Sequence, residues 1–504
     1  MRTTPLTLPE SGERGRLAVL VASTATLLLS SACKPPENGC TNQLTRCGPI
    51  GTCRPNPLAP EDPNQITCAC TDGTFVDPSV SVCAATFASI SVNGVAVELA
   101  DATGLTVVDL PAGATTLDVH ATAATPQTHV LIEGQAVEEL QLPWTPPLTK
   151  VTVALAATTG QVVTSVQLIV RVGVHFDRVA GFVGGGLGVA LAGDGHTLAV
   201  GSLGAGMVRV WTEADAGWQA PQSLSGGGYF GWTVALAEQG EVLAVSCTAG
   251  FQQPCAGPGL RMFRRQAAGF AEEPAVPEPG EPRLAIDAAG QTVWAALGAS
   301  GAVAFGRDGG TWERVAALAG PASSVAVSGD GRVVAVGSQD DATLRLFAPA
   351  DGGWVQTGLL QGDGGFGSSV SLSRDATVLV VSARSASPLT AWIYEQAGGV
   401  WQPRLELHPA ISPALAVSGS VDFQVPVACS LDGQTAAVGF PVDRSVVVAQ
   451  RGASGWSVLE AVVPHGHAQF GLFGNGVALS ADGRRLAVSA PGADVDLTVH
   501  DRGR

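Results

Sequence analysis

One short phrase recurs through residues 174–504 and constrains the fold more than any other feature of the chain. It has the pattern V-a-l-x-x-D-G-x-x-L-A-V-G and is clearest at Val189–Gly201, Val325–Gly337 and Val477–Ser489. Weaker copies bring the number to seven, with the Leu of L-A-V, or its equivalent, at positions 198, 243, 293, 334, 379, 436 and 486. A repeat of this length indicates stacked units, none of which can bury its own faces alone.

Each unit has the features of one four-stranded antiparallel sheet. Two strands flank the Asp-Gly turn, a third follows, and a Gly-rich turn with an aromatic residue begins the fourth. The aromatic residues at this place are Trp218, Phe270, Trp312, Trp354, Trp401 and Trp456. We interpret them as packing residues. Sheets of four strands repeated every 40–50 residues predict an all-β fold that ends in a seven-bladed β-propeller over residues 174–504.

The last unit lacks its fourth strand, because the chain ends soon after the expected third strand at Val495–Val499. Val174–Ala180, which precedes the first unit, has a sequence that could supply it. Such pairing would hide two open sheet edges and close the ring.

Residues 85–173 contain six short β-branched runs separated by turn residues such as Asn93-Gly94 and Thr159-Gly160. This spacing predicts a small β-sandwich. The order of the runs resembles the immunoglobulin-like and cadherin-like sandwiches of bacterial surface proteins, and the resemblance implies that the segment is a spacer.

Cysteines cluster before the sandwich. Of ten in the chain, six lie between Cys40 and Cys83, and Cys33 stands just before them. In an exported chain, six cysteines in so short a segment predict three disulfides that replace a hydrophobic core. A zinc site is the alternative, but no His accompanies them. Farther on, Cys247 and Cys255 are close enough in sequence for a loop disulfide.

The cysteine spacing C-x6-C-x5-C-x14-C-x-C-x12-C, with Gly73 and Phe75, resembles an EGF-like module over residues 33–84. From the spacing alone, fifteen pairings of six cysteines are open. The resemblance implies the pairs Cys40–Cys53, Cys47–Cys68 and Cys70–Cys83.

The first 32 residues have the features of an export signal. Arg14 and Arg16 precede an apolar run, Leu17–Leu29, and small residues then lead to Cys33. This arrangement resembles a bacterial lipoprotein signal, which implies acylation of Cys33 and, with Lys34 next to it, an outer-membrane or cell-surface location. Cleavage nearby without lipidation is the alternative. The acyl chains would be the anchor, because the run is too short for a stable transmembrane helix.

The repeats themselves resemble the FG-GAP repeats of the integrin α-chain head. Phe230-Gly231, Phe366-Gly367 and Phe473-Gly474 match the first signature, and Ser489-Ala490-Pro491 approximates the second. Members of that family bind calcium in loops with several oxygen ligands. Here five of the seven turns offer a single acid, at Asp194, Asp330, Asp375, Asp432 or Asp482, and the other two have Gln239 and Ala289 at that place. We therefore interpret these residues as turn formers and predict no metal and no cofactor.

The net charge of the chain and its lack of catalytic motifs exclude several classes of function. The net charge of −16 and the absence of Lys/Arg runs argue against a nucleic-acid partner. No metalloprotease, nucleophile-elbow or phosphate-loop motif occurs, so we expect no enzyme and no catalytic residue. The predicted function is binding or adhesion at the cell surface, with an extracellular protein or glycan as partner. Two alternatives stay open: a hydrolase or lyase of extracellular polysaccharide with residues from several blades, and a structural envelope component.

Overall fold

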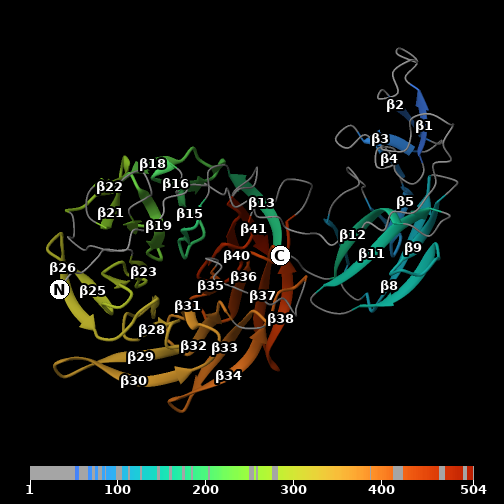
Figure 1. Ribbon diagram of the computed structural model, residues 1–504. Coiled ribbons are helices and arrows are strands. Elements are labelled where there is room, and N and C mark those ends of the chain that lie inside the picture. Colours follow the sequence, from blue (N-terminus) through green and yellow to red (C-terminus); the bar gives the residue numbers. More distant parts are fainter. Residues whose placement is uncertain are drawn as a thin grey trace, which may run out of the picture. The chain divides into compact units, whose positions relative to one another are not determined.

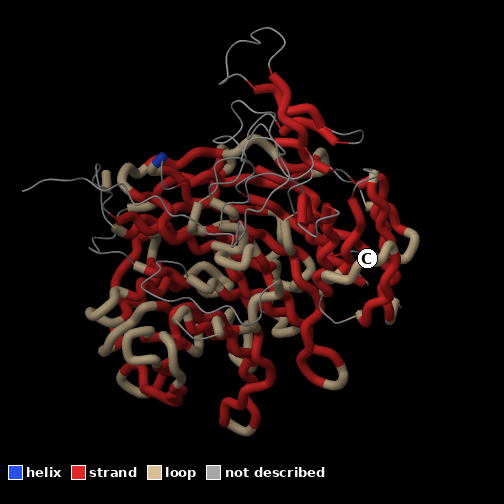
Figure 2. The backbone as a smooth tube through the Cα atoms, turned by 45° about the vertical axis from the view of Figure 1, so that its right-hand side comes forward, coloured by secondary structure: helices blue, strands red, loops and turns tan. Residues whose placement is uncertain are grey.

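The structure of the chain is a computed structural model, and apart from a single 3₁₀ residue at Ala205 the regular secondary structure of the described residues is β-strand (Figure 2). The structure describes residues 51–55, 66–70, 74–77, 82–85, 87–97, 105–111, 114–124, 128–144, 148–157, 162–172, 176–182, 186–202, 205–248, 255–256, 259–274, 282–385, 388–411, 424–464, 472–491 and 497–502. Within these ranges there is no α-helix, and hence no helix able to cross a membrane. The predicted all-β class is confirmed.

A first compact unit ends near residue 84. Its strands form two pairs: β1 (Gly51–Pro55) with β2 (Ile66–Cys70), and β3 (Thr74–Asp77) with β4 (Val82–Ala85). In the first pair Cys53 lies opposite Cys68 in the backbone register. Residues Cys33, Cys40 and Cys47 lie outside the described residues, so lipidation and the three disulfides stay predictions.

The second compact unit begins with two four-stranded sheets. One has the order β10 (Glu139–Pro143), β8 (Thr116–Ala123), β5 (Phe87–Val92), β6 (Val95–Ala96), and the other β7 (Leu105–Leu110), β12 (Val162–Val172), β11 (Thr149–Ala157), β9 (Thr128–Ile132). Alternate residues of β8, among them Leu117, Val119 and Ala121, are fully buried. One face of this strand therefore forms core, as a period of two requires.

In the described part of residues 174–504, seven further sheets follow along the chain, in colours from green to red in Figure 1. The first four are β14 (Val189–Leu191), β15 (Thr197–Ser202), β16 (Met207–Ala214), β17 (Gly217–Trp218), β18 (Gln222–Ser225); β19 (Tyr229–Leu236), β20 (Val242–Thr248), β21 (Leu260–Gln266), β22 (Gly269–Glu272); β23 (Arg283–Ile286), β24 (Thr292–Ala296), β25 (Ala302–Asp308), β26 (Thr311–Leu318); and β27 (Ser324–Val327), β28 (Val334–Ser338), β29 (Thr343–Ala350), β30 (Gly353–Gln361).

The remaining three are β31 (Phe366–Leu372), β32 (Val378–Ala383), β33 (Thr390–Ala397), β34 (Val400–Leu407); β35 (Val427–Cys429), β36 (Thr435–Phe440), β37 (Ser445–Gly452), β38 (Gly455–Val462); and β39 (Gly476–Leu479), β40 (Arg485–Ser489), β41 (Leu497–Arg502), β13 (Phe176–Phe182). Each of the seven repeat anchors, from Leu198 to Leu486, lies on the second strand of one sheet. These strands are buried almost throughout, because each sheet packs between two others.

The last sheet joins the two ends of the repeat region. Strand β13 pairs antiparallel with β41, from Phe176 opposite Arg502 to Phe182 opposite Leu497. Phe176 is fully buried in the core of this sheet, and its N–H donates to the carboxylate of Glu460 at 2.7 Å. The prediction that the segment before the first repeat completes the last sheet is confirmed.

Close contacts between glycines of neighbouring sheets explain two features of the repeat. Several copies of the phrase end in Gly, and Phe-Gly stands at the start of the following sheet or just before it. A Cβ on Gly201 would lie 1.9 Å from the carbonyl oxygen of Gly231, and a Cβ on Gly231 would lie 2.5 Å from Cα of Gly201. The pairs Gly337/Gly367 and Gly439/Gly474 make the same approach between their sheets. Where Ser382 replaces the first Gly, its hydroxyl donates to the carbonyl of Val425 in the next sheet, at 2.7 Å.

A buried ionic contact joins the two-sheet segment to the propeller region. Arg171 of β12 donates to Glu460 of β38 at 2.8 Å, and its guanidinium also contacts both oxygens of Asp109. Arg171 and Glu460 are 1% and 2% exposed. Burial raises the pKa of Glu460 to about 7, although Arg171 and the Phe176 N–H favour its ionised form. Leu148 and Ile169 pack against Ala461 and Val463 beside this contact.

We predict that Gly231→Ala destabilises the protein about 1–3 kcal/mol more than Gly352→Ala, because only the first adds overpacking to backbone strain. Gly352 is a matched control: its φ of +95° is close to the +92° of Gly231, but a Cβ added to it would have no neighbouring atom within 4 Å. Denaturant unfolding of both variants measures the difference. Equal losses would show that the contact between sheets does not matter.

We also predict that replacing residues 176–180 with Gly and Ser lowers the melting temperature, because the last sheet loses its outer strand and Phe176 leaves the core. Val179→Ser is the control on the same strand, since Val179 is 51% exposed. Calorimetry that shows an unchanged melting temperature for the replaced segment would exclude a role for β13 in closure.

Candidate functional site: the central channel

The innermost strands surround a channel. The strand-to-strand contacts run in order from β14 through β19, β23, β27, β31 and β35 to β39, and β39 contacts β14 again. One aliphatic residue from each innermost strand lines the channel midway, and we call this set the aliphatic ring: Val189, Val234, Leu284, Val325, Val370, Val427 and Val477. It corresponds to the first position of the repeated phrase. The ring separates an entry chamber of about 220 Å³ from a turn chamber of about 250 Å³.

The turn chamber ends at the seven turns that follow the innermost strands. Each turn donates a backbone N–H to a carbonyl of the turn in the next sheet, at N···O distances of 2.8–3.3 Å. The bonds pass from Asp194 through Glu238, Ala288, Asp330, Arg374 and Asp432 to Ala481, whose N–H donates to Gly193. We call this closed cycle the turn ring.

The Asp residues of the repeat shape these turns. Oδ1 of Asp330 accepts from the Ser328 hydroxyl at 2.6 Å and from the N–H of Arg332 at 3.0 Å, and Asp432 and Asp482 are bonded in the same way. At Asp375 burial disfavours the charged form, but hydrogen bonds from Thr377 and Ser373 outweigh it and lower the pKa. These hydrogen bonds confirm the prediction that the Asp residues form the turns.

An ion pair crosses the turn end of the channel. Arg374 donates to the carboxylate of Glu238, although the two residues belong to sheets that are not neighbours in the ring. This hydrogen bond raises the pKa of Arg374, and burial opposes the rise. Both side chains need small neighbours: a Cβ on Gly193 would lie 2.5 Å from Cγ of Glu238, and one on Gly329 would lie 2.9 Å from Cγ of Arg374.

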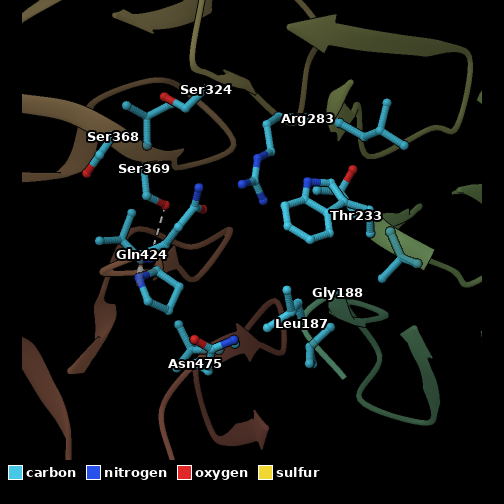
Figure 3. A pocket seen from close by; sticks show the side chains of 18 of the residues that line it. Leu187, Gly188, Thr233, Arg283, Ser324, Ser368, Ser369, Gln424 and Asn475 are labelled. Carbon is cyan, nitrogen blue, oxygen red and sulfur yellow. Dashed lines mark hydrogen bonds between the residues drawn. The ribbon is translucent and has the colours of Figure 1, made fainter. Parts of the chain in front are cut away.

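The entry chamber has a different lining. Arg283 lies with its guanidinium carbon 5.2 Å from the ring centre of Trp232, and Figure 3 shows Arg283 and Gln424 extending into the pocket, with Asn475 at its edge. Among the described residues that line this chamber there is one cation and no Asp, Glu or His. It is therefore a polar entry above an aliphatic floor.

Several hydroxyl groups of the entry chamber are already engaged. Thr233 donates to the carbonyl of Pro282 at 2.8 Å, Ser324 donates to Gly367 at 2.7 Å, and Ser368 bonds to Ser382. No hydrogen bond joins the side chain of Gln424 or Asn475 to another residue in the described part of the chain. The amides of Gln424 and Asn475 are thus groups suited to contact a ligand.

The sequence-predicted site residues lie elsewhere. Cys53, Cys68, Cys70 and Cys83 lie on the strands of the first unit. Cys247, on β20, forms a disulfide with Cys255. Cys429 is partly buried and lines the turn chamber.

Arg283 and Trp232 were not predicted from the sequence. Alignment of the seven repeats would have drawn attention to Arg283, because the other repeats have an uncharged residue at its position. The residues just before the aliphatic ring are Gly188, Thr233, Arg283, Ser324, Ser369, Pro426 and Gly476. Arg283 alone among them is charged.

Comparison with known proteins bears on the fold alone. No protein-family model matches the sequence, and no curated protein matches it. Solved structures do match: the β-propeller domain of Cps50 (Swd1) from Myceliophteria thermophila is 12% identical, with a TM-score of 0.50, over 65% of this chain and 99% of that one. The chain contains a β-propeller. A second match, in a structure of the Mitotic Checkpoint Complex, is 15% identical over 66% of this chain and 96% of that one, with a TM-score of 0.46.

We predict that the double variant Glu238→Ala/Arg374→Ala makes Cys429 react several-fold faster with a maleimide, because the turn end of the channel loses its crossing side chains. The loss in stability should stay below about 1 kcal/mol, since Arg374 is partly exposed and such pairs contribute little. Arg332→Ala, on a neighbouring turn, is the control, and Cys429→Ser identifies the labelled thiol. An unchanged labelling rate would contradict a barrier at this end.

Proposed function

We propose that this chain is an exported, lipid-anchored surface protein whose closed, seven-bladed propeller binds an extracellular ligand at the entry chamber. The observation that carries the proposal is the asymmetry of the channel. Its turn end is crossed by the Glu238–Arg374 ion pair, whereas its other end presents Arg283, Gln424 and Asn475 around a cavity of about 220 Å³. A concave site with an apolar floor and a few convergent polar groups is the usual form of a binding site.

Binding is favoured over catalysis by the chemistry of the described lining. General acid–base catalysis or glycoside hydrolysis needs a carboxylate, an imidazole or a comparable group at the reacting bond. Among the residues that the structure describes, the acids that line the channel are Glu238 and Asp287, and both lie at the turn chamber. Glu238 is paired with Arg374, and Asp287 accepts the N–H of Gln291 within its own turn. Neither is placed to act on a ligand in the entry chamber.

The preceding segments suit a stalk. Cys33 would be the anchor, residues 33–84 a disulfide-bonded EGF-like spacer and residues 85–173 an immunoglobulin- or cadherin-like spacer. The buried Arg171–Glu460 contact supports a spacer that is held firmly to the propeller, since breaking such a pair leaves a buried charge without its partner. The stalk would then hold the binding site of the propeller away from the membrane surface, where it could bind an extracellular ligand.

The test uses the mature chain with Cys33→Ser, which cannot be acylated at that position, on arrays of extracellular proteins and glycans. We expect at least one ligand whose binding falls ten-fold or more in Gln424→Leu and Trp232→Ala, because both variants alter the entry chamber. Trp401→Ala, an aromatic change on the outer strand β34, is the control. Ligands that bind these variants equally would place the function elsewhere, and cleavage of a polysaccharide would favour the enzyme. Release of the Cys33→Ser variant from membranes tests the anchor.

A further inference from the structure

A groove between the last two sheets opens at the turn end of the propeller, away from the entry chamber. Its volume is about 510 Å³. We infer that this groove binds a sugar that carries a phosphate group, with the phosphate against Arg484 and Arg502. Such a ligand would be additional to the one proposed for the entry chamber. The charged and amide side chains that line the groove include Asp432, Gln450 and Arg451 of one sheet and Asp482, Arg484 and Arg502 of the next.

Arg484 and Arg502 break a regularity of the repeat. In six sheets the carbonyl of the residue after the turn accepts the N–H of a residue from the third strand, so the two residues are cross-strand neighbours. The pair Arg484 and Arg502 brings two like charges together, which destabilises a sheet. A negatively charged ligand would remove this repulsion. The other five pairs carry opposite charges or at most one full charge: His196/Glu213, Glu241/Arg265, Gln291/Arg307, Thr377/Gln396 and Gln434/Arg451.

The two guanidinium groups of this pair are available to a ligand. In the described part of the chain, the hydrogen bonds of Arg484 and Arg502 are those of their backbone groups. The neighbouring acid Asp501 contacts Arg485 instead, at 2.6 Å between Oδ1 and Nε. The planar N–H groups of Arg match the oxygens of a phosphate, and such charge-assisted bonds are stronger than neutral ones. Two guanidinium groups on adjacent strands therefore suit a phosphate.

The remaining lining favours a sugar as the carrier of the phosphate. Small-molecule sites have volumes of about 300–1,000 Å³, so the groove has room for more than a phosphate. Asp432 and Asp482 each accept a backbone N–H of their own turn through Oδ1. Their carboxylates would repel a phosphate placed beside them, but they can accept hydroxyl groups, as can the amide of Gln450. A phosphate ester with several hydroxyl groups satisfies both parts of the lining.

The walls of the groove are fixed before a ligand arrives. The N–H of Asp432 donates to the carbonyl of Ala481 at 3.0 Å, which sets the separation of the two turns. On the wall opposite Arg484, the guanidinium of Arg451 donates to the carboxylate of Glu395 at 2.8 Å. A site that is ordered in advance loses less conformational entropy when it binds its ligand.

The experiment is isothermal titration calorimetry of glucose 6-phosphate, glucose and inorganic phosphate with the full mature chain carrying Cys33→Ser. We expect glucose 6-phosphate to bind about ten-fold more tightly than either other compound, because it alone has both the phosphate and the hydroxyl groups. The double variant Arg484→Gln/Arg502→Gln should weaken this binding about ten-fold or more. Asp432→Asn should weaken glucose 6-phosphate but not inorganic phosphate, because it removes an acceptor for hydroxyl groups.

Arg332→Gln is the matched control, because Arg332 follows its turn as Arg484 does but does not line the groove. The double variant should melt no lower than the parent chain, since it relieves repulsion, and a melting curve shows that it is folded. Gln424→Leu should leave the binding unchanged, which separates this groove from the entry chamber. Equal binding of glucose 6-phosphate to the parent chain and to the double variant would overturn the inference.

Two further outcomes decide the nature of the ligand. If glucose 6-phosphate bound no more tightly than glucose or inorganic phosphate, the assignment to a sugar phosphate would be wrong. Vesicles of phosphatidylcholine with phosphatidylinositol 4-phosphate present a phosphate among hydroxyl groups on a lipid. Binding to them that needs Arg484 and exceeds the binding of glucose 6-phosphate about ten-fold would support the inference with a lipid headgroup as the source; without that gain, the source is a glycan or a free ester.

Discussion

The turn ring is the constraint on which the rest of the propeller depends. Seven backbone hydrogen bonds connect the turns of successive sheets, and the last returns to the first at Gly193. Each innermost strand is therefore held at its place around the axis by hydrogen bonds between backbone groups. The second strand of each sheet is buried between the two neighbouring sheets. A gap in this cycle of hydrogen bonds would therefore expose the apolar faces of two sheets at once.

A fixed ring gives the channel two unlike ends. At one end the turns come close enough for Glu238 and Arg374 to meet across the axis. At the other end the chain arrives from the outer strands, and the residues just before the aliphatic ring vary from one sheet to the next. That variation places Arg283 and Gln424 beside an otherwise uncharged described lining. The repeated position thus gives the channel its aliphatic ring. The residues just before this ring differ between sheets, and their polar side chains could recognise a ligand.

Much of the fold could be predicted from the sequence, because its determinants repeat. The Asp-Gly turn and the Leu-Ala-Val strand recur with the same local physics in every sheet, so even the weak copy at Val293 falls on the expected second strand. The completing strand β13 was predictable because an unpaired strand edge must be covered. The structure accounts for two departures. Trp294 fills the space that Ala occupies in five other copies, and it packs edge-on against Trp354 with ring centres 5.1 Å apart. Ala376 takes the turn position that Gly holds in other copies.

The site was less predictable, because its contacts join residues that no periodicity relates. Glu238 and Arg374 are 136 positions apart, and Arg171 and Glu460 are 289 apart. The first pair meets because the ring of sheets closes, and the second because β12 packs against β38. Neither arrangement can be read from the sequence around the four residues. Arg283 could have been noticed as the one charged residue before the aliphatic ring, but its stacking on Trp232 depends on the approach of two sheets.

The most direct test of the central claim is amide hydrogen exchange at the seven donors of the turn ring, including Asp194, Glu238, Arg374 and Ala481. A closed cycle predicts that these amides are strongly protected and exchange together, at the free energy of unfolding of the whole propeller. If the Ala481 amide, which joins the last sheet to the first, exchanged at the rate of an exposed loop while the others stayed protected, the ring would be open and the account would be wrong.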